Sequence, residues 1–475
     1  MISVKNQNRL AIKLGVLLVV AIGIASCSKK SPEIPATAED NGVAFYMTTG
    51  DRASLLAKTA LTVPDQNAAV IAVDTTQRFQ SIDGFGFSLT GGSAALLHAL
   101  DSGKRATWLK ELFLTEGQGI GISYLRISIG ASDLDDHVFS YADKKPANGK
   151  AFQFSLDEDR KHLIPILKEI IALNPNIKIM GSPWSAPTWM KDNDKAKAGK
   201  LKPEFYEAYA KYFVQYIQEM KQEGIAIDAV TLQNEPENPK NTPSMIMTAE
   251  DQALFVKKNL GPAFKTAGIA TKIVVFDHNC DHPEYPIAVL NDAEAKPFVD
   301  GSAFHLYLGE IEVLSKVHEA HPDKNVYFTE QWTSGEGSFA GDLQWHTKHL
   351  VIGATRNWSR NVLEWNLAAD PQFNPHTPDG GCTSCQGALT IGAEVTRNVS
   401  YYIIGHASKF VPEGSVRIAS TEVEGVPNVT FITPQGKKVM VAVNDTDAEK
   451  HVGVKAGTKT FNATLPKGAV ATFVW

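Results

Sequence analysis

Two glutamates that follow apolar runs offer the most distinctive chemistry of this chain. The segment TLQNEPENPK, residues 231–240, places Glu235 and Glu237 around a proline after the apolar stretch IAIDAVTLQ, and FTEQW places Glu330 after another such stretch. Retaining hydrolysis of a glycosidic bond uses two carboxyl groups about 5 Å apart. Glu235 and Glu330 are the best candidates for this pair, whereas Glu237, just past the strand end, is expected to be a solvated bystander.

The elements that must position these residues alternate between short apolar runs and longer amphipathic segments from residue 80 onward. This rhythm is typical of a parallel α/β sheet, and eight repeats predict a closed (β/α)₈ TIM barrel. Strand C-terminal ends in such a barrel share one active-site mouth. The predicted strands are SIDGFGFSL, ISYLRISIG, IKIMGSPWS, AVTLQNEP, KIVVFDHN, GSAFHLYLG, NVYFTEQW and NVLEWNLAA.

Polar and aromatic residues recur at the ends of most of these predicted strands. One such residue is weak evidence, because strand ends are often solvated, but the repetition favours a common site at the barrel mouth. The residues concerned are Arg126, Trp184, Asn234, Glu235, His278, His305, Tyr307, Glu330, Trp332, Trp365 and Asn366.

A second, discontinuous domain is predicted beside the barrel. The last 64 residues or so alternate apolar and polar positions with Gly, Pro and Asn between the runs, a pattern of antiparallel strands. Strand-like segments also precede the barrel, so they are expected to pair with the C-terminal ones. The expected boundaries are 42–78 and 412–475 for an antiparallel β-sandwich and 79–411 for the catalytic barrel.

The first 27 residues have a basic start, an apolar run and the ending IASC. This layout predicts a lipoprotein signal peptide over residues 1–26, acylation of Cys27 and a flexible tether over 27–41. The expected location is the cell envelope, at the outer membrane. An ordinary signal peptide with an incidental cysteine is the alternative. Removing residues 1–26 takes away three positive charges and changes the formal charge from −6 to −9, which argues against nucleic acid as a partner.

The remaining cysteines predict no metal site. Cys382 and Cys385 in GGCTSCQG lack a second cysteine pair or a histidine cluster, so a local disulfide is the expected state, with Cys280 a buried free thiol. No nucleotide-binding loop is present either. We therefore expect the chemistry to need neither a metal ion nor a cofactor.

Several motifs in order resemble glycoside hydrolase family 30, the family of glucosylceramidases and endo-β-1,6-glucanases. The resemblance extends from about residue 79 to 418, through GFGFSLTGGSAALL, GISYLRISIGASD, GSPWSAPTWMKDN, TLQNEP, FHLYLG, FTEQW and EWNLAADPQFNP. It implies that Glu235 is the general acid/base, with a raised pKa, and that Glu330 is the nucleophile. Arg126 and Tyr307 would keep Glu330 ionised, and Asn234 would bind the sugar 2-hydroxyl.

The resemblance also implies a sugar-binding wall. Trp184, Trp365 and Trp332 would pack against the sugar, and His305 resembles a pocket residue of the family. His278 is more compatible with a structural role, and Asp83 has no clear assignment.

One departure from the family bears on the substrate. Exo-acting glucosylceramidases have an aspartate after the first-strand motif that holds a terminal glucose, and Gly91 stands at the matching position here. An opening at Gly91 would let a β-1,6-linked chain continue, which predicts an endo-β-1,6-glucanase acting on β-glucan. The alternatives are an exo-acting glucosylceramidase or β-glucosidase, an endo-xylanase, and a carbohydrate-binding lipoprotein without catalysis.

Overall fold

The computed structural model describes residues 42–475 except 64, 66, 67 and 148–150. The predicted signal peptide, the tether and Cys27 lie outside the described residues. Within the described part of the chain, no helix is long and apolar enough to cross a membrane.

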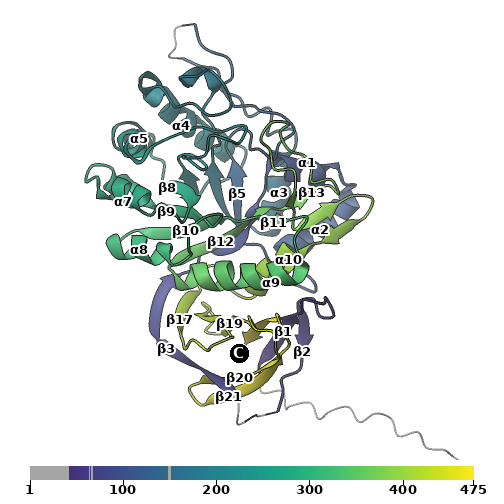
Figure 1. Ribbon diagram of the computed structural model, residues 1–475. Helices are drawn as coiled ribbons and strands as arrows, with labels where there is room; N and C mark the ends of the chain where they lie inside the picture. The colour runs from purple at the N-terminus through teal and green to yellow at the C-terminus, as the bar shows by residue number, and fades with distance from the viewer. Residues whose placement is uncertain (1–41, 64, 66–67, 148–150) are drawn as a thin grey trace, which may run out of the picture. The chain divides into compact units, whose positions relative to one another are not determined.

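Eight parallel strands close into the predicted barrel (Figure 1). Neighbours in the chain are neighbours in the barrel, and the eighth strand pairs with the first. These strands are apolar along most of their length because they are covered on both faces. They are β4 (Gly84–Ser88), β5 (Tyr124–Ser128), β6 (Lys178–Ser182), β7 (Ala229–Thr231), β8 (Lys272–Asn279), β9 (Val299–His305), β10 (Asn325–Glu330) and β12 (Ser359–Asn366).

Helices surround the barrel, and most of them bury one face. In α4 (Tyr206–Gln222), for example, Tyr209, Phe213, Tyr216 and Met220 recur at helical spacing and are fully buried. The other helices are α1 (Gly91–Ala99), α2 (Ser102–Phe113), α3 (Leu163–Leu173), α5 (Ala249–Phe255), α6 (Gly261–Ala267), α7 (Glu284–Asn291), α8 (Val313–Ala320), α9 (Phe339–His346) and α10 (Val399–Ser408), with short 3₁₀ turns η1 (Thr188–Met190), η2 (Pro203–Phe205) and η4 (Lys296–Phe298) and π-helical segments η3 (Val256–Leu260) and η5 (Thr347–Ala354).

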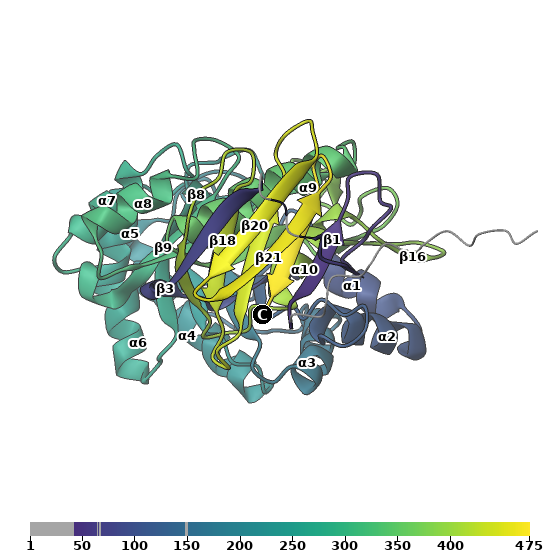
Figure 2. The ribbon, with the colours of Figure 1, turned by 90° about the horizontal axis from the view of Figure 1, so that it is seen from below.

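The second domain combines strands from both ends of the described chain, as predicted. Figure 2 shows the purple strands β1 and β3 among the yellow C-terminal strands, and β1 pairs with β22 while β3 pairs with β17 and β20. The sheet order is β2-β1-β22-β19-β18-β17-β3-β20-β21. The strands are β1 (Ala44–Thr48), β2 (Ala57–Thr59), β3 (Ala69–Ser81), β17 (Val416–Ser420), β18 (Asn428–Ile432), β19 (Lys438–Val443), β20 (Lys450–Ala456), β21 (Lys459–Leu465) and β22 (Val470–Val474).

One strand pair departs from the predicted antiparallel arrangement. β20 lies parallel to β3: the chain leaves β19 without forming a hairpin and places β20 on the other side of β3 in the sheet order. β3 is 13 residues long and ends at Ser81, past the boundary expected at residue 78. The first part of β3, residues 69–73, pairs with β20, and the part from Val73 to Ser81 pairs with β17. The register between β3 and β17 shifts along this second part.

The sandwich has two apolar faces. Met440 and Ala442 of β19 face the core between the layers, while Val439 and Val441 belong to the core shared with the barrel. This alternation follows from the two-residue period of a strand. The sandwich is therefore packed against the barrel through apolar contacts, including the rings of Phe85 and Phe431, whose centroids lie 6.3 Å apart.

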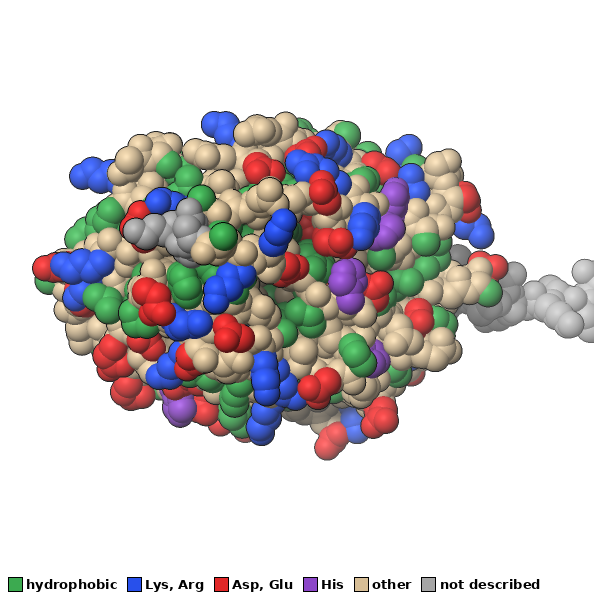
Figure 3. All heavy atoms as spheres, turned by 90° about the horizontal axis from the view of Figure 1, so that it is seen from above, with side chains coloured by type: hydrophobic (Ala, Val, Ile, Leu, Met, Phe, Trp, Pro, Cys, Tyr) green, Lys and Arg blue, Asp and Glu red, His purple; other side chains and the backbone are tan. Residues whose placement is uncertain are grey.

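Short strands in the loops after the last two barrel strands build up the mouth. β11 (Thr333–Ser334) pairs with β14 (Cys385–Gln386), and β13 (Ala368–Ala369), β15 (Leu389–Ile391) and β16 (Val395–Arg397) form a small sheet. On the face of the molecule in Figure 3, acidic and basic side chains are interspersed, and hydrophobic side chains are scattered between them.

Candidate active site

A pocket of about 210 Å³ at the barrel mouth contains both predicted carboxylates. A larger cavity, of about 680 Å³, contains neither of them and is lined instead by residues such as Asp83 and Arg360, which form an ion pair. Asp83 is therefore a structural residue away from the site. The smaller pocket is lined by Asp133, Trp184, Glu235, Asn238, Asn241, Tyr307, Glu330, Trp332, Trp365, Gly380, Cys382 and Cys385.

Glu330, at the end of β10, is held by three side chains. Arg126 donates from Nη1 to Oε2 at 2.6 Å, and the Tyr307 hydroxyl donates to Oε1 at 2.9 Å. His305 Nδ1 lies 3.6 Å from Oε1. The resemblance implied the contacts of Arg126 and Tyr307 with Glu330, and the structure brings all three residues together.

Glu235, like Glu330, lies close to Nδ1 of His305. Its Oε1 is 3.4 Å from His305 Nδ1 and 3.9 Å from His278 Nδ1, and its Oε2 accepts from Asn238 at 2.7 Å. His278, for which a structural role was expected, thus lies next to the predicted acid/base Glu235. Oε1 of Glu235 and Oε1 of Glu330 lie 3.4 and 3.6 Å from the same nitrogen, so the two oxygens are at most about 7 Å apart. This bound excludes most of the distances that separate the two carboxyl groups in inverting glycosidases.

A buried aspartate that the sequence analysis did not single out organises the floor of the site. Asp277 of β8 is fully buried and accepts hydrogen bonds from Arg126 at 2.8 Å and from His305 Nε2 at 3.1 Å. Arg126, also fully buried, donates its remaining Nη2 bonds to Asn234 Oδ1 at 2.6 Å and to Ser182 Oγ at 3.2 Å. The carboxylate of Asp277 further accepts from the hydroxyls of Ser182, Thr231 and Thr329.

A bulge in β8 explains how Asp277 reaches this position. Phe276 and Asp277 both have positive φ, 73° and 66°, and the register with β9 shifts between Phe276 and His278. In a regular strand Asp277 and His278 would point to opposite faces, but the bulge allows both to reach the site. An aspartate inside the apolar run KIVVFDHN was the available sequence signal.

The electrostatics of the two glutamates differ from expectation. Burial would raise the pKa of Glu235, but the hydrogen bond and charge of His305, together with the charge of His278, lower it. Burial raises the pKa of Glu330 against the opposing charges of His305 and Arg126. The expected raised pKa at Glu235 is therefore wrong for this site. The reason is that His305 lies between the two carboxylates.

Three further pKa values are shifted at the site. Burial would lower the pKa of His305, but Glu330, Asp277 and Glu235 raise it to about 9. Burial would raise the pKa of Asp277, but Arg126 and His305 hold it well below its usual range. At Asp133, burial and the charges of Glu330 and Glu235 raise the pKa to about 8. Asp133 is a second pocket carboxyl that sequence reasoning missed.

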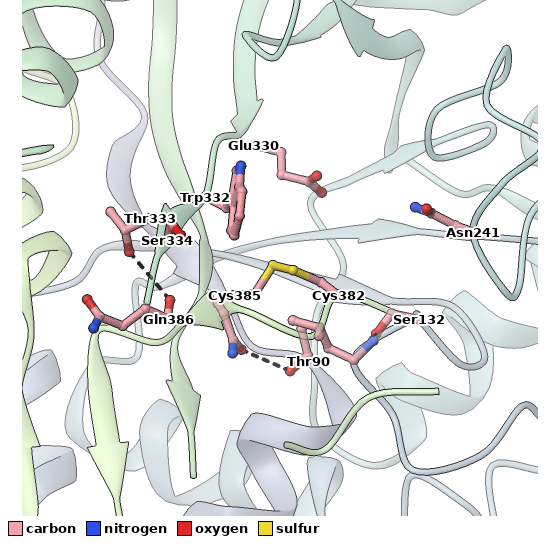
Figure 4. The surroundings of a disulfide bond; sticks show 12 residues. Thr90, Ser132, Asn241, Glu330, Trp332, Thr333, Ser334, Cys382, Cys385 and Gln386 are labelled. Carbon is pink, nitrogen blue, oxygen red and sulfur yellow. Dashed lines mark hydrogen bonds between the residues drawn. A yellow bond between two sulfur atoms is a disulfide. The ribbon is translucent and has the colours of Figure 1, made fainter. Parts of the chain in front are cut away.

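The three predicted tryptophans line the pocket together with a disulfide. Trp184 and Trp365 are stacked with ring centroids 5.3 Å apart, and the Arg126 guanidinium lies 4.8 Å from the Trp184 ring. Figure 4 shows the Cys382–Cys385 disulfide beside Trp332. The predicted local disulfide is confirmed, and Cys280 is the buried free thiol that was expected.

Two residues near the motifs lie outside the pocket. Glu237 bonds to His282 Nδ1 at 2.8 Å and is absent from the pocket lining. Gly91 begins α1, and a Cβ there would meet Asp135 Oδ1 at 1.7 Å. The missing side chain of Gly91 therefore makes room for Asp135, and the prediction that it opens the active site to a glucan is wrong.

Comparison with known proteins assigns the family. Residues 82–411 match the glycosyl hydrolase family 30 TIM-barrel domain, and residues 414–473 match the glycosyl hydrolase family 30 beta sandwich domain. The chain belongs to glycosyl hydrolase family 30. Both parts of the fold thus have counterparts in the family, and the chain is a glycosidase.

Its relatives include enzymes of two named activities. Endo-1,6-beta-D-glucanase BGN16.3 of Trichoderma harzianum is 32% identical over 84% of this chain and 85% of its own length. The lysosomal acid glucosylceramidase of Mus musculus is 27% identical over 86% of this chain and 83% of its own length. Among solved structures, the endo-beta1,6-glucanase BT3312 is 36% identical, with a TM-score of 0.85 over 91% of this chain and 99% of that chain.

Proposed function

We propose that this family 30 enzyme is an endo-β-1,6-glucanase that cleaves β-glucosidic bonds with retention of configuration. The observation that supports this most is that Glu235 and Glu330 face one pocket and contact the same histidine. The fungal relatives and the solved structure named as endo-β-1,6-glucanases support the linkage.

In the proposed first step, Glu330 attacks the anomeric carbon and forms a glycosyl ester, while the bond to the leaving oxygen breaks. Glu235 gives its proton to that oxygen. In the second step Glu235 takes a proton from water, whose oxygen displaces Glu330 from the same carbon. Arg126 and Tyr307 stabilise the Glu330 carboxylate before attack and as it leaves.

The proton that Glu235 needs has a nearby source. In the structure His305 favours the ionised form of Glu235, and its Nδ1 lies 3.4 Å from Oε1. When a sugar excludes water from the pocket, an ion pair of His305 and Glu235 becomes less favourable than the neutral pair. We infer that the proton then moves from Nδ1 to Oε1, which converts Glu235 into the acid.

Asn234 and the tryptophans would orient the sugar. The amide oxygen of Asn234 accepts from Arg126, so its NH₂ group remains to donate to the 2-hydroxyl. Such a bond contributes to catalysis when it strengthens in the transition state. Trp184, Trp365 and Trp332 offer flat apolar surfaces to the C–H faces of the ring.

The test is a time course of products from a linear β-1,6-glucan, beside release of nitrophenol from 4-nitrophenyl β-glucoside. Endo action predicts early oligosaccharides of mixed length with little nitrophenol. Glu235→Gln and Glu330→Gln should both abolish turnover of the glucan, and unchanged cleavage by either variant would refute the assignment of the pair.

A specific feature favours exo action as the second candidate. Asp133 lines the pocket, and its carboxyl could bind hydroxyls of a terminal sugar. Asp133 shares the pocket lining with Cys382 and Cys385 of the disulfide loop. Glucose as the sole early product, or rapid release of nitrophenol, would support a glucosylceramidase-like enzyme instead.

We also propose that the mature protein is an outer-membrane lipoprotein anchored at Cys27. The basic start, the apolar run and IASC support this proposal, and a glucan-degrading role is compatible with an envelope location. Mass spectrometry of the N-terminal peptide should find residue 27 first and acylated. Cys27→Ser should release the protein from the membrane fraction; retention of the variant would contradict the anchor.

A further inference from the structure

Three side chains at the site form a set that could coordinate a metal ion. Oxygen or nitrogen atoms of Glu235, His278 and His305 all lie within 4.8 Å of one another, and all three residues are buried. We propose that this cluster binds a divalent transition-metal ion, with Zn²⁺ as the representative, and that the bound ion inhibits the enzyme. The binding stands on geometry alone, whereas the inhibition rests on the proposed role of Glu235.

His278 supplies an available ligand atom. Its Nδ1 has no hydrogen-bond partner within the described part of the chain, although the residue is only 9% exposed. Nearly all buried polar atoms are paired, so an unpaired imidazole nitrogen needs an explanation. This nitrogen lies 3.9 Å from Glu235 Oε1, and a metal ion between them would satisfy it.

The other two ligands are oriented by their neighbours. His305 contacts Asp277 through Nε2 at 3.1 Å, which leaves Nδ1 on the side of Glu235. A carboxylate on the distal nitrogen is the usual partner of a metal-bound histidine, because it fixes the ring and strengthens the ligand. Asn238 holds Oε2 of Glu235 at 2.7 Å, so Oε1 is the oxygen that faces both imidazoles.

Two of the three ligand spacings require little movement, and all three ligand atoms lie within 4.8 Å of one another. With bonds of about 2.0–2.1 Å, ligand atoms of a tetrahedral zinc site lie about 3.3 Å apart. Glu235 Oε1 is 3.4 Å from His305 Nδ1 and 3.9 Å from His278 Nδ1. Two histidines and one carboxylate are also a donor set that zinc accepts with a fourth position open.

The bound ion would disable both carboxylates. Oxygen Oε1 of Glu235 would be committed to the metal and could no longer exchange a proton with the leaving oxygen. Glu330 Oε1 is 3.6 Å from the same His305 nitrogen, so the positive charge would also lower its nucleophilicity. The ion thus acts as a reversible inhibitor, and chelators should restore activity.

The experiment uses the full chain, freed of metal by dialysis, with glucan hydrolysis measured against increasing Zn²⁺. In His278→Asn, the Zn²⁺ concentration for half inhibition, relative to the variant's own uninhibited rate, should rise at least about tenfold. The matched control is His98→Gln. His98 and His162 form an exposed pair with Nδ1 atoms 2.9 Å apart, a second place where zinc could bind. This control should leave the inhibition unchanged.

Titration calorimetry with Zn²⁺ gives a readout independent of turnover. Wild type and His98→Gln should retain one site that His278→Asn and Glu235→Gln lose or weaken at least about tenfold. Glu235→Gln serves as the second variant should His278→Asn fail to fold. Equal affinity of wild type and both site variants would overturn the proposal. If calorimetry finds the site but no glucan is hydrolysed, the proposed function fails and the metal site stands.

Discussion

The buried histidine between barrel and sandwich should make the fold sensitive to acid. His406 of α10 bonds through Nδ1 to Thr472 Oγ1 and through Nε2 to Thr48 Oγ1, each at 2.8 Å. The Thr472 hydroxyl donates to the His406 carbonyl, so it must accept from Nδ1–H. Nε2 is then the acceptor for the Thr48 hydroxyl, whose oxygen already accepts the N–H of Leu56. The neutral ring is bonded on both sides, and a second ring proton would displace the Thr48 donor.

The size of the effect follows from the pKa. Burial lowers the pKa of His406 from 6.5 to about 3. Between about pH 6.5 and 3 the histidine is therefore protonated in the unfolded chain but neutral in the folded chain. The contribution of His406 to the free energy of unfolding is fully present above about pH 6.5 and is lost as the pH falls toward 3. The whole gap corresponds to about 5 kcal/mol, and about 2 kcal/mol of it is lost by pH 5. A domain is typically stable by about 5–15 kcal/mol, so this loss is measurable.

The assay compares urea unfolding of wild type and His406→Gln at pH 7 and pH 5. Glutamine offers an NH₂ group that donates and a carbonyl oxygen that accepts but does not titrate, and the other titrating groups are common to both proteins. Wild type should lose about 2 kcal/mol more free energy of unfolding than the variant between the two pH values. Parallel losses would refute the assignment of His406 as a buried neutral ring.

Three further predictions concern the site. Arg126→Lys should lower kcat/KM for glucan at least about 100-fold, because an ammonium cannot replace the forked bonds to two carboxylates; loss below about tenfold would contradict this. Replacing Cys382 and Cys385 with serine should raise KM several-fold with a smaller change in kcat, since the disulfide forms the pocket wall; unchanged KM would show the wall to be dispensable. Glu237→Gln should keep kcat/KM within about twofold, and a large loss would place it in the chemistry after all.

The fold could be predicted from the sequence because each barrel strand is covered on both faces. NVYFTEQW is an apolar run closed by polar residues, and β10 occupies Asn325–Glu330 of it. The pairing of N- and C-terminal strands also followed, since strand-like segments before the barrel need partners. The parallel pairing of β3 and β20 could not be predicted from the sequence. The direction of a strand in a sandwich depends on how the connections cross between the layers and not on local composition.

The site was only partly predictable. Glu235 and Glu330 follow recognisable strands, so their meeting at the mouth follows from barrel topology. Asp277 was missed because a bulge in β8 changes which side chains reach the interior, and a bulge has no clear sequence signature. The prediction for Gly91 was wrong because it assumed that the glycine makes room for the substrate. The glycine makes room for the neighbouring side chain of Asp135 instead.

The two glutamates keep the net charge of the site constant through the first step of the proposed mechanism. Before attack, Glu330 is negative and Glu235 is protonated; in the glycosyl-enzyme, Glu330 is an ester and Glu235 is negative. In this mechanism His305 has given its Nδ1 proton to Glu235 before attack, and Nδ1, 3.4 Å from Glu235 Oε1, can take that proton back once the second step has left Glu235 protonated again. Asp277 meanwhile offsets Arg126 in both states. A buried site that keeps the same net charge through the step avoids the desolvation cost of a newly created unpaired ion.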